Sequence, residues 1–326
     1  MIKILVTGAS GLLGSNTIQE LLSKGYQVRA LVRDKSKFAL EYHKHVELII
    51  GSLSDRGVIE KAVKGCKFII HCAAETSQSK IHYSDYYKNN VEAADILYKI
   101  AIDCGVNRII HVSTCNVFGF GNLMNLGDEK KPIKNPFTNS LYVQSKFASQ
   151  NLALTFSDKI DIIIVNPTFL IGPFDQKPSS GRIIIHGYGK RIIFYPSGGK
   201  NFVDVRDAAK AIAALLLYGR NREAYILAGE NLTYKQFFRK LSNYTSNKPL
   251  LIKIPNGVLL FAGLIGNILR KLGIENEYTL TNMKILCIKN YYSNSKIQKE
   301  LNIVFTPIDN AISDSINWFK STGRIK

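Results

Sequence analysis

Tyr142 and Lys146 have the residue types and the spacing of an acid–base pair. Residues four apart stand on one face of a helix, so the two side chains would lie one turn apart. An ammonium group beside a phenol favours the phenolate, and we therefore expect the pKa of Tyr142 to fall below its usual value of about 10. Such a phenol can exchange a proton with a carbonyl or carbinol oxygen near neutral pH. Taken alone, the pair is also typical of an ordinary helix surface.

Three glycines near the N-terminus predict a binding site for a dinucleotide. Gly8, Gly11 and Gly14 follow a short apolar run at residues 4–6 and precede a helical pattern. The first glycine permits a tight turn, the second lets the backbone approach a pyrophosphate, and the third lets the helix pack closely on the strand. A glycine turn with a purely structural role is the alternative. In a chain with a dinucleotide site, the tyrosine and lysine above are predicted to be catalytic.

The opening Thr7-Gly8, the glycine spacing and the Tyr-x-x-x-Lys pair together resemble the extended short-chain dehydrogenase/reductase superfamily, of the NAD-dependent epimerase/dehydratase type. This resemblance implies an α/β fold with a Rossmann-type, doubly wound parallel sheet. A smaller, mainly helical C-terminal part would bind the substrate. The resemblance also implies that Lys146 holds the nicotinamide ribose.

A pair of hydroxyl residues completes the expected catalytic set. The apolar run at 108–112 ends in Ser113 and Thr114 and is followed by the triplet at 117–119, which resembles the hydroxyl-bearing strand end of the superfamily. Counted back from the end of that triplet, Thr114 falls at the position of the substrate hydroxyl, with Ser113 beside it. A hydroxyl there would hold the substrate oxygen within reach of Tyr142. Alternatively, the two hydroxyls only cap the end of a strand.

Further segments match the superfamily position by position. Residues 166–174 look like the corresponding segment of dihydroflavonol-4-reductase-like and cinnamoyl-CoA-reductase-like enzymes, and less like that of sugar-nucleotide epimerases. Ser52 stands where relatives usually carry an aspartate near the adenine, which puts the adenine contact in doubt. Asp207 is expected to cap a helix. The residues expected at the cofactor are Gly8, Ser10, Gly11, Leu12, Leu13, Gly14, Arg33, Ser52, Leu53, Ala73, Ala74, Asn90, Tyr142, Lys146, Pro167 and Phe169.

The end of the second predicted strand bears on the choice of cofactor. NAD enzymes usually carry an acidic residue there, which accepts hydrogen bonds from the adenosine ribose. Here Val32 takes that place and Arg33 follows, where a guanidinium could meet a 2′-phosphate. A charge-assisted hydrogen bond of this kind is worth roughly 1.5–3 kcal/mol. The sequence therefore favours NADP over NAD, although Asp34 would restore an acidic ribose partner if the register shifted.

The elements that must position these groups alternate along the chain. In the first half we expect strands at 2–6, 27–32, 46–50, 68–72, 108–113 and 160–166, and helices near 11–24, 54–64, 85–104 and 142–156. This alternation implies right-handed crossovers and a parallel sheet. Later helices are expected at 205–218, 233–244, 256–272, 279–289 and 307–320. A dinucleotide-binding domain would span 1–166, with 202–228 returning to it, and the substrate-binding part would comprise 167–201 and 229–326.

Composition limits the other function classes. The chain of 326 residues carries 43 basic and 25 acidic residues and a net charge of +18. The basic residues are scattered, so no nucleic-acid partner is expected. Because the chain is also rich in Ile, Asn, Lys and Tyr, the excess charge is interpreted mainly as a bias of composition, and otherwise as attraction for anionic ligands or an acidic membrane surface. Five cysteines without a CxxC pair predict neither a disulfide framework nor a metal site. Without a signal peptide or a run of roughly 18 apolar residues, a cytoplasmic protein is expected.

Three functions remain open. The favoured one is a reductase that uses NADPH on a ketone or aldehyde, so that its partner is a small carbonyl or alcohol compound. A nucleotide-sugar epimerase or dehydratase with tightly bound NAD is the alternative, and a non-catalytic cofactor-sensing protein is the third. The apolar segment 255–271 is expected to form a buried helix, or else to line a lipophilic pocket or touch a membrane surface. The helices at 85–104 and 142–156 are where many relatives of this superfamily form a homodimer.

Overall fold

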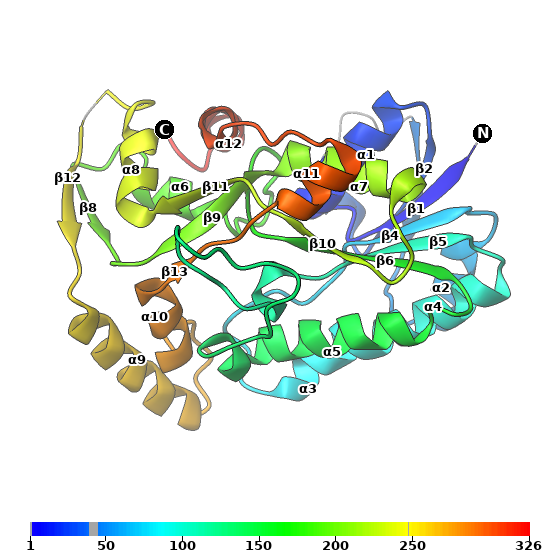
Figure 1. Ribbon diagram of the computed structural model, residues 1–326, viewed down its shortest axis with the longest axis horizontal. Helices are drawn as coiled ribbons and strands as arrows, with labels where there is room; N and C mark the ends of the chain where they lie inside the picture. The colour runs from blue at the N-terminus through cyan, green and yellow to red at the C-terminus, as the bar shows by residue number, and fades with distance from the viewer. Residues whose placement is uncertain (1, 39–44, 247) are drawn as a thin grey trace.

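The computed structural model describes residues 2–38, 45–246 and 248–326. A seven-stranded, wholly parallel sheet occupies one half of the molecule (Figure 1), in the order β10-β6-β5-β4-β1-β2-β3. Its strands are β1 (Lys3–Thr7), β2 (Gln27–Val32), β3 (Val46–Ile50), β4 (Phe68–His71), β5 (Arg108–Val112), β6 (Asp161–Pro167) and β10 (Ala224–Leu227). The strand order reverses between β1 and β4, which is where ligands bind in open α/β sheets.

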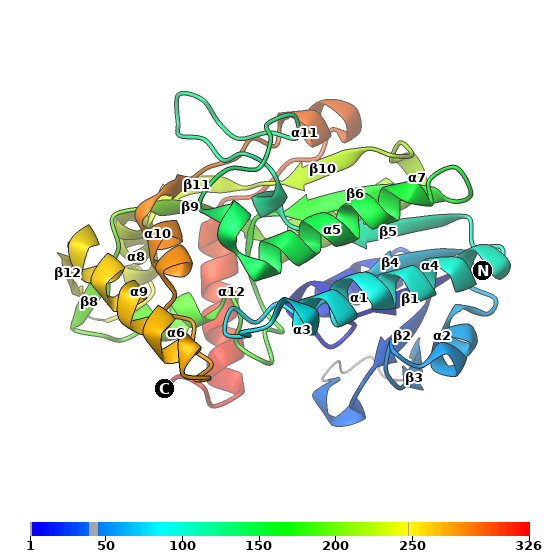
Figure 2. The same ribbon diagram turned by 90° about the horizontal axis from the view of Figure 1, so that it is seen from below.

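Helices cover both faces of this sheet, as the alternation of apolar residues along the strands requires. Ile4 and Val6 of β1 pack with α1 (Leu12–Ser23) and α7 (Val205–Tyr218) on one face. Leu5 packs on the other face, where α2 (Arg56–Val63), α4 (Ala93–Asp103) and α5 (Leu141–Thr155) lie (Figures 1 and 2). The predicted doubly wound fold is therefore confirmed.

The long helix expected at 85–104 is continuous but not uniform. It consists of α3 (Tyr83–Tyr87), the π-helical turn η3 (Lys88–Glu92) and α4. Such π-helical turns within α-helices are often found at functional sites. The predicted cofactor residue Asn90 lies in this turn.

The rest of the chain forms a smaller part, which we define as the elements outside the large sheet and its covering helices. It holds two small sheets that the sequence did not reveal: β7 (Phe169–Ile171), β9 (Gly199–Asp204), β11 (Glu230–Thr233) and β13 (Lys289–Asn290) form one, and β8 (Ile192–Tyr195) and β12 (Leu250–Lys253) form the other. Its helices are α6 (Arg182–Gly187), α8 (Tyr234–Ser242), α9 (Asn256–Lys271), α10 (Leu280–Cys287) and α12 (Ile308–Ser321). A further unforeseen helix, α11 (Ser295–Leu301), packs on the large sheet through Ile297.

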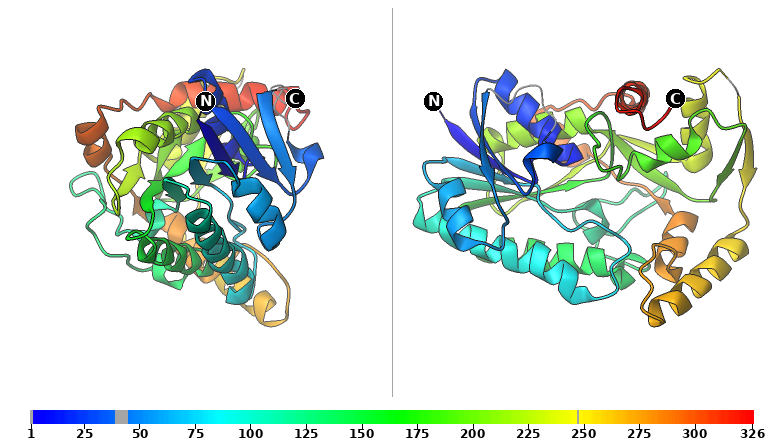
Figure 3. Two further views of the ribbon diagram at one scale, coloured as in Figure 1. Left: turned by 90° about the vertical axis from the view of Figure 1, so that its right-hand side faces the viewer. Right: turned by 180° about the vertical axis from the view of Figure 1, so that it is seen from behind.

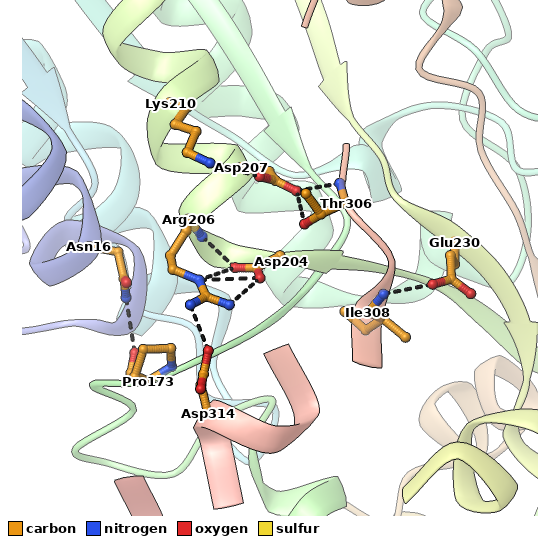
Figure 4. Close-up of polar contacts among 10 residues, drawn as sticks. All are labelled: Asn16, Pro173, Asp204, Arg206, Asp207, Lys210, Glu230, Thr306, Ile308 and Asp314. Atoms are coloured by element: carbon orange, nitrogen blue, oxygen red, sulfur yellow. Dashed lines mark hydrogen bonds and ion pairs between the residues drawn. The ribbon is translucent and has the colours of Figure 1, made fainter. Parts of the chain in front are cut away.

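Polar contacts at the start of α7 join the two parts (Figure 4). The sequence led us to expect Asp207 as a helix cap, but Asp204 is the N-cap of α7 and accepts a hydrogen bond from the Arg206 amide at 2.8 Å. Arg206 also bridges Asp204 and Asp314 of α12. Asp207 lies within the first turn of α7, and its carboxylate accepts hydrogen bonds from the amide and hydroxyl of Thr306, each at 2.7 Å. The carboxylate thus fastens a distant segment instead of capping its own helix.

The predicted apolar helix at 255–271 is present as α9, but the expectation that it is buried is wrong. Only Leu259, Gly263 and Gly266 of this helix are buried. In the described part of the chain, no helix is long and apolar enough to cross a membrane.

Candidate active site

The glycine turn after β1 has the backbone geometry that the sequence predicts. Gly8 has a φ of +66°, which disfavours a side chain, and a Cβ there would lie 2.6 Å from the amide nitrogen of Ala73. A Cβ on Gly14 would lie 2.3 Å from the carbonyl oxygen of Gly8. The first glycine therefore lets β1 and β4 approach, and the last lets α1 pack directly on the turn.

The N-terminus of α1 suits an anion. Gly11 is its N-cap residue and no side chain caps it, so the first amides of the helix, at Leu12, Leu13 and Gly14, have no side-chain acceptor. Free amides and the positive end of a helix dipole form a ready site for a pyrophosphate. Ser10 lies half-buried in the same turn. The residues present therefore fit a dinucleotide.

The fold brings Thr114 and Tyr142 together from different elements. Thr114 follows β5 and is the N-cap of the short helix η4 (Cys115–Val117), while Tyr142 lies in the first turn of α5. The Thr114 side chain lies close enough to the Tyr142 phenol to lower the pKa of that phenol, and the Thr114 hydroxyl accepts a hydrogen bond from the Asn116 amide at 3.3 Å. Lys146, one turn further along α5, is 3% exposed and donates a hydrogen bond from Nζ to the carbonyl oxygen of Val112 at 2.7 Å. The three predicted catalytic groups thus surround the end of β5.

The predicted fall in the pKa of Tyr142 is not found. Burial raises the pKa of this phenol, and the nearby Thr114 side chain opposes the rise only in part. The Lys146 ammonium is engaged by the Val112 carbonyl, and burial lowers the pKa of Lys146 to about 8. At neutral pH the lysine is therefore still mostly a cation, while the phenol keeps its proton and is available as an acid.

Two other residues predicted for the site, Ser113 and Asn90, are buried near these catalytic groups. Ser113 is buried, and its hydroxyl finds no hydrogen-bond partner among the described residues. Asn90 is also buried, and its side-chain amide binds both backbone groups of Glu75 and the Ser145 hydroxyl. Asn90 therefore connects the segment after β4 to α5. Its side-chain amide is already hydrogen-bonded within the protein.

The residues predicted to lie near the adenosine are exposed or half-buried. Arg33 is exposed immediately after β2. Asp34 accepts hydrogen bonds from the amide and hydroxyl of Ser36, at 3.0 and 2.7 Å, so its carboxylate is already used locally. The Ser52 and Ser54 hydroxyls are hydrogen-bonded at 2.9 Å. Leu53 is half-buried and packs against the core on the face of the sheet that α2, α4 and α5 cover.

The remaining predicted cofactor residues follow two strand ends. Ala73 and Ala74 come after β4, where the Ala73 amide donates to the Thr7 hydroxyl at 3.3 Å. Pro167 ends β6 and Phe169 begins β7. These four residues lie at the carboxyl edge of the large sheet, as the resemblance implies.

The sequence did not reveal Lys200 of β9. Its ammonium lies 4.7 Å from the centroid of the Phe169 ring, and burial lowers the pKa of this lysine. Charge interaction with Cys115 has the opposite, smaller effect. No local pattern marks Lys200, because its place beside Phe169 depends on the pairing of β7 with β9.

A cavity of about 240 Å³ adjoins Tyr142. Its wall includes Tyr86 of α3, Arg270 of α9 and Asn282 of α10, so three separate segments meet there. The Tyr86 hydroxyl donates to the carbonyl oxygen of Ser77 at 2.6 Å, which fixes that wall. Arg270 and Asn282 are far from Tyr142 in the sequence, so only the packing of α9 and α10 in the fold places them at this cavity.

Comparison with known proteins identifies relatives of this chain. Residues 4–228 match the model of the NAD dependent epimerase/dehydratase family. A Synechocystis sp. protein, whose name assigns it provisionally as a dihydroflavonol 4-reductase, is 31% identical over 98% of this chain and 95% of its own length. Sterol demethylase protein B of Methylococcus capsulatus is 28% identical over 98% of this chain and 99% of its own length. The crystal structure of gox2253 covers all of both chains with a TM-score of 0.85 and 32% identity.

Proposed function

Because the chain belongs to the NAD dependent epimerase/dehydratase family, we propose that it is an oxidoreductase that reduces a ketone or aldehyde with a nicotinamide cofactor. The placement of Thr114 at the end of β5 beside Tyr142 in the first turn of α5, with Lys146 one turn away and bonded to the Val112 carbonyl, carries this proposal. Relatives named for a dihydroflavonol and for sterols support a ring ketone of low polarity as the substrate.

Each catalytic residue has a distinct role. When bound, the nicotinamide supplies the hydride. Thr114 donates a hydrogen bond to the substrate oxygen and holds it against the phenol, and Tyr142 transfers its proton to that oxygen as negative charge develops. The raised pKa of Tyr142 keeps the phenol protonated before the reaction. The Lys146 cation stabilises the phenolate that remains and would also hold the ribose.

The chemistry of the neighbouring side chains supports reduction over dehydration. Elimination of water needs a base for the carbon-bound proton and an acid for the leaving hydroxyl. In the described part of the chain, no carboxylate bonds to Thr114, Tyr142 or Lys146. The two residues after Thr114 are neutral as well. Burial raises the pKa of the Cys115 thiol to about 12, and the Asn116 side chain is an amide. One proton donor is enough for reduction of a carbonyl.

The proposed cofactor is NADP in preference to NAD. Arg33 stands exposed at the end of β2, where a 2′-phosphate would lie, and the adjacent Asp34 carboxylate is engaged by Ser36. Val32, at the usual position of the acidic ribose partner, has no group that could accept a hydrogen bond from the ribose.

A nucleotide-sugar epimerase or dehydratase is the second candidate, because one observation favours it. A cavity of about 430 Å³ is lined by Lys131, Lys134 and Lys289 beside the ring of Phe120. Among the described residues, no carboxylate forms an ion pair with these three lysines. Such a cavity would suit the diphosphate of a nucleotide sugar.

The substitution Tyr142→Phe tests the proposed function. We expect kcat on a panel of ring ketones and aldehydes to fall by roughly 10²–10⁴-fold, since the proton donor is lost. The dissociation constant for NADPH, measured by fluorescence titration, should stay nearly the same. Tyr218→Phe, on the exposed end of α7, is the matched control. Unchanged turnover in the Tyr142 variant would rule out the assignment.

The nicotinamide content of the purified protein distinguishes the two candidate functions. A reductase should release its nicotinamide each cycle, so the extract of the denatured protein should contain little of it and added NADPH should bind. An epimerase or dehydratase retains its cofactor through a cycle of oxidation and re-reduction. Stoichiometric NAD in the extract, together with turnover of a nucleotide sugar, would contradict the reductase.

A further inference from the structure

The outer side of α9 and the residue after it carry large apolar side chains. Six of them, between 45% and 71% exposed, are Val258, Phe261, Leu264, Ile265, Ile268 and Leu272. Their spacing of three and four residues places them in one stripe along the helix. Single exposed apolar residues need no explanation, but a contiguous patch of this kind marks an interaction site.

The inner side of α9 buries one large side chain, Leu259, and two glycines. Gly263 and Gly266 are buried against the start of α10, where a Cβ would lie 2.7 Å from the Leu280 Cα and 1.8 Å from the Tyr278 carbonyl oxygen, respectively. An ordinary surface helix buries its large apolar residues and exposes polar ones. In α9 most of the large apolar residues are exposed instead. Packing within the chain therefore does not account for the apolar stripe.

A neighbouring pair of strands extends the apolar surface. Ile192 of β8 pairs with Leu250 of β12, and Phe194 pairs with Ile252. All four side chains are exposed, while Ile193, between Ile192 and Phe194 in β8, is buried. The pair and α9 lie together at the end of the molecule opposite the N-terminus (Figures 1 and 2), and the views in Figure 3 agree. We call the stripe and these four residues the α9 face.

The segments that contain the α9 face carry only basic residues, and the two acidic residues that follow α9, Glu275 and Glu277, form ion pairs with Lys80 and Arg182. Segments 189–195 and 248–273, which contain the α9 face, have no acidic residue. Their basic residues are Lys190, Arg191, Lys248, Lys253, Arg270 and Lys271. None of them forms an ion pair within the part of the chain that the structure describes. An apolar stripe with unpaired cations beside it is typical of helices that lie in a membrane interface.

We propose that the α9 face docks the protein onto the surface of a membrane that contains anionic lipid. The apolar side chains would enter the boundary between headgroups and acyl chains, and the basic residues other than Arg270 would meet the lipid phosphates. Arg270 is excluded because its guanidinium donates a hydrogen bond to the Lys80 carbonyl oxygen. A 16-residue helix is about 24 Å long, enough to lie along the surface, and no described helix can span a bilayer. A second copy is the less suitable occupant, because it would bring another chain with a net charge of +18 against the same cations.

This inference does not depend on the proposed reaction, but it has a bearing on the substrate. Asn267 and Arg270 of α9 also line the cavity beside Tyr142. The same helix therefore borders both the docking surface and the candidate substrate pocket. An enzyme placed in this way could receive a lipophilic ketone from the bilayer.

Flotation of the whole protein with lipid vesicles tests the proposal. We expect binding to vesicles of phosphatidylcholine with 30 mol% phosphatidylglycerol, and at least tenfold weaker binding to phosphatidylcholine alone. The triple variant Phe261→Ser, Ile265→Ser, Ile268→Ser should lose at least tenfold in affinity for the mixed vesicles. The double variant Lys253→Gln, Lys271→Gln should bind more weakly and show a smaller dependence on salt.

A matched control uses exposed apolar residues elsewhere. The double variant Leu217→Ser, Tyr218→Ser on α7 should bind vesicles like the wild type. Circular dichroism and NADPH titration verify that every variant is folded, whatever its activity. Absence of vesicle binding by the wild type, or equal binding by the triple variant, would overturn the proposal. So would a dimer in sedimentation equilibrium that only the triple variant dissociates, since the α9 face would then be covered by a second copy.

Discussion

At the scale of single residues, Lys146 shows what spacing in the sequence can reveal and what it cannot. The i, i+4 relation placed it beside Tyr142 on one helix, and that is where it lies. Its bond to the Val112 carbonyl, and the burial that governs both pKa values, come from β5 and from segments far away in sequence. The direction of the Tyr142 shift was therefore mispredicted, because desolvation depends on the complete fold.

Arg33→Ala should change the choice of cofactor. Arg33 is exposed and no hydrogen bond or ion pair to another described residue is found for it, so its removal should not affect folding. We expect NADPH binding to weaken by about ten- to a hundredfold, the equivalent of one charge-assisted hydrogen bond, while NADH binding stays unchanged. Fluorescence titration with both nucleotides measures this, with the exposed Arg239→Ala on α8 as control. Equal losses for NADPH and NADH would contradict the role in 2′-phosphate binding.

At the scale of elements, the sequence predicted best where local pattern and buried environment agree. The bounds of β2 and β3 match the expectation, and α7 begins and ends at the predicted residues. The six strands of the two small sheets were missed. Five of them have four residues or fewer, too short for a periodicity to develop. The sixth, β9, has six residues and begins at the end of a segment in which clustered Pro and Gly indicated a loop.

Gly14→Ala should disrupt the first turn of α1. The added methyl group would lie 2.3 Å from the Gly8 carbonyl oxygen, so the helix must move away from the turn. We expect destabilisation by about 1–3 kcal/mol and at least tenfold weaker cofactor binding, measured by thermal unfolding and titration. Gly257→Ala in the first turn of α9 is the control, because a Cβ there meets nothing within 4 Å. It should leave stability unchanged or raise it slightly. A Gly14 variant with unaltered stability and affinity would show that the close approach is dispensable.

At the scale of the whole molecule, the sequence predicted the class of fold, while the proposed boundaries of the dinucleotide-binding and substrate-binding parts stay a prediction. The joints between the parts were not predictable. Asp207 was assigned to its own helix, whereas it fastens Thr306, about a hundred residues later. A carboxylate at a helix start has the same local signature in both roles, and only the path of the chain distinguishes them.

Asp207→Ala should loosen the C-terminal segment. It removes the acceptor for the amide and hydroxyl of Thr306 and should cost about 1–3 kcal/mol of stability. Hydrogen exchange should accelerate most over residues 303–308 and the start of α12. The control Asp158→Ala breaks an exposed pair with Arg222 and should change stability by less than about 0.5 kcal/mol. Uniform acceleration over the whole chain would argue against a local joint.

The path of the chain between the two parts also bears on how such a protein can evolve. After β9 in the smaller part, α7 and β10 return to the large sheet, and α11 returns again before α12 ends in the smaller part. The smaller part is therefore built from three separated pieces of one gene. A single recombination event cannot replace it as a module, since any one crossover would leave mismatched halves in both cores. Change confined to the smaller part is therefore expected to proceed by substitution within its three pieces.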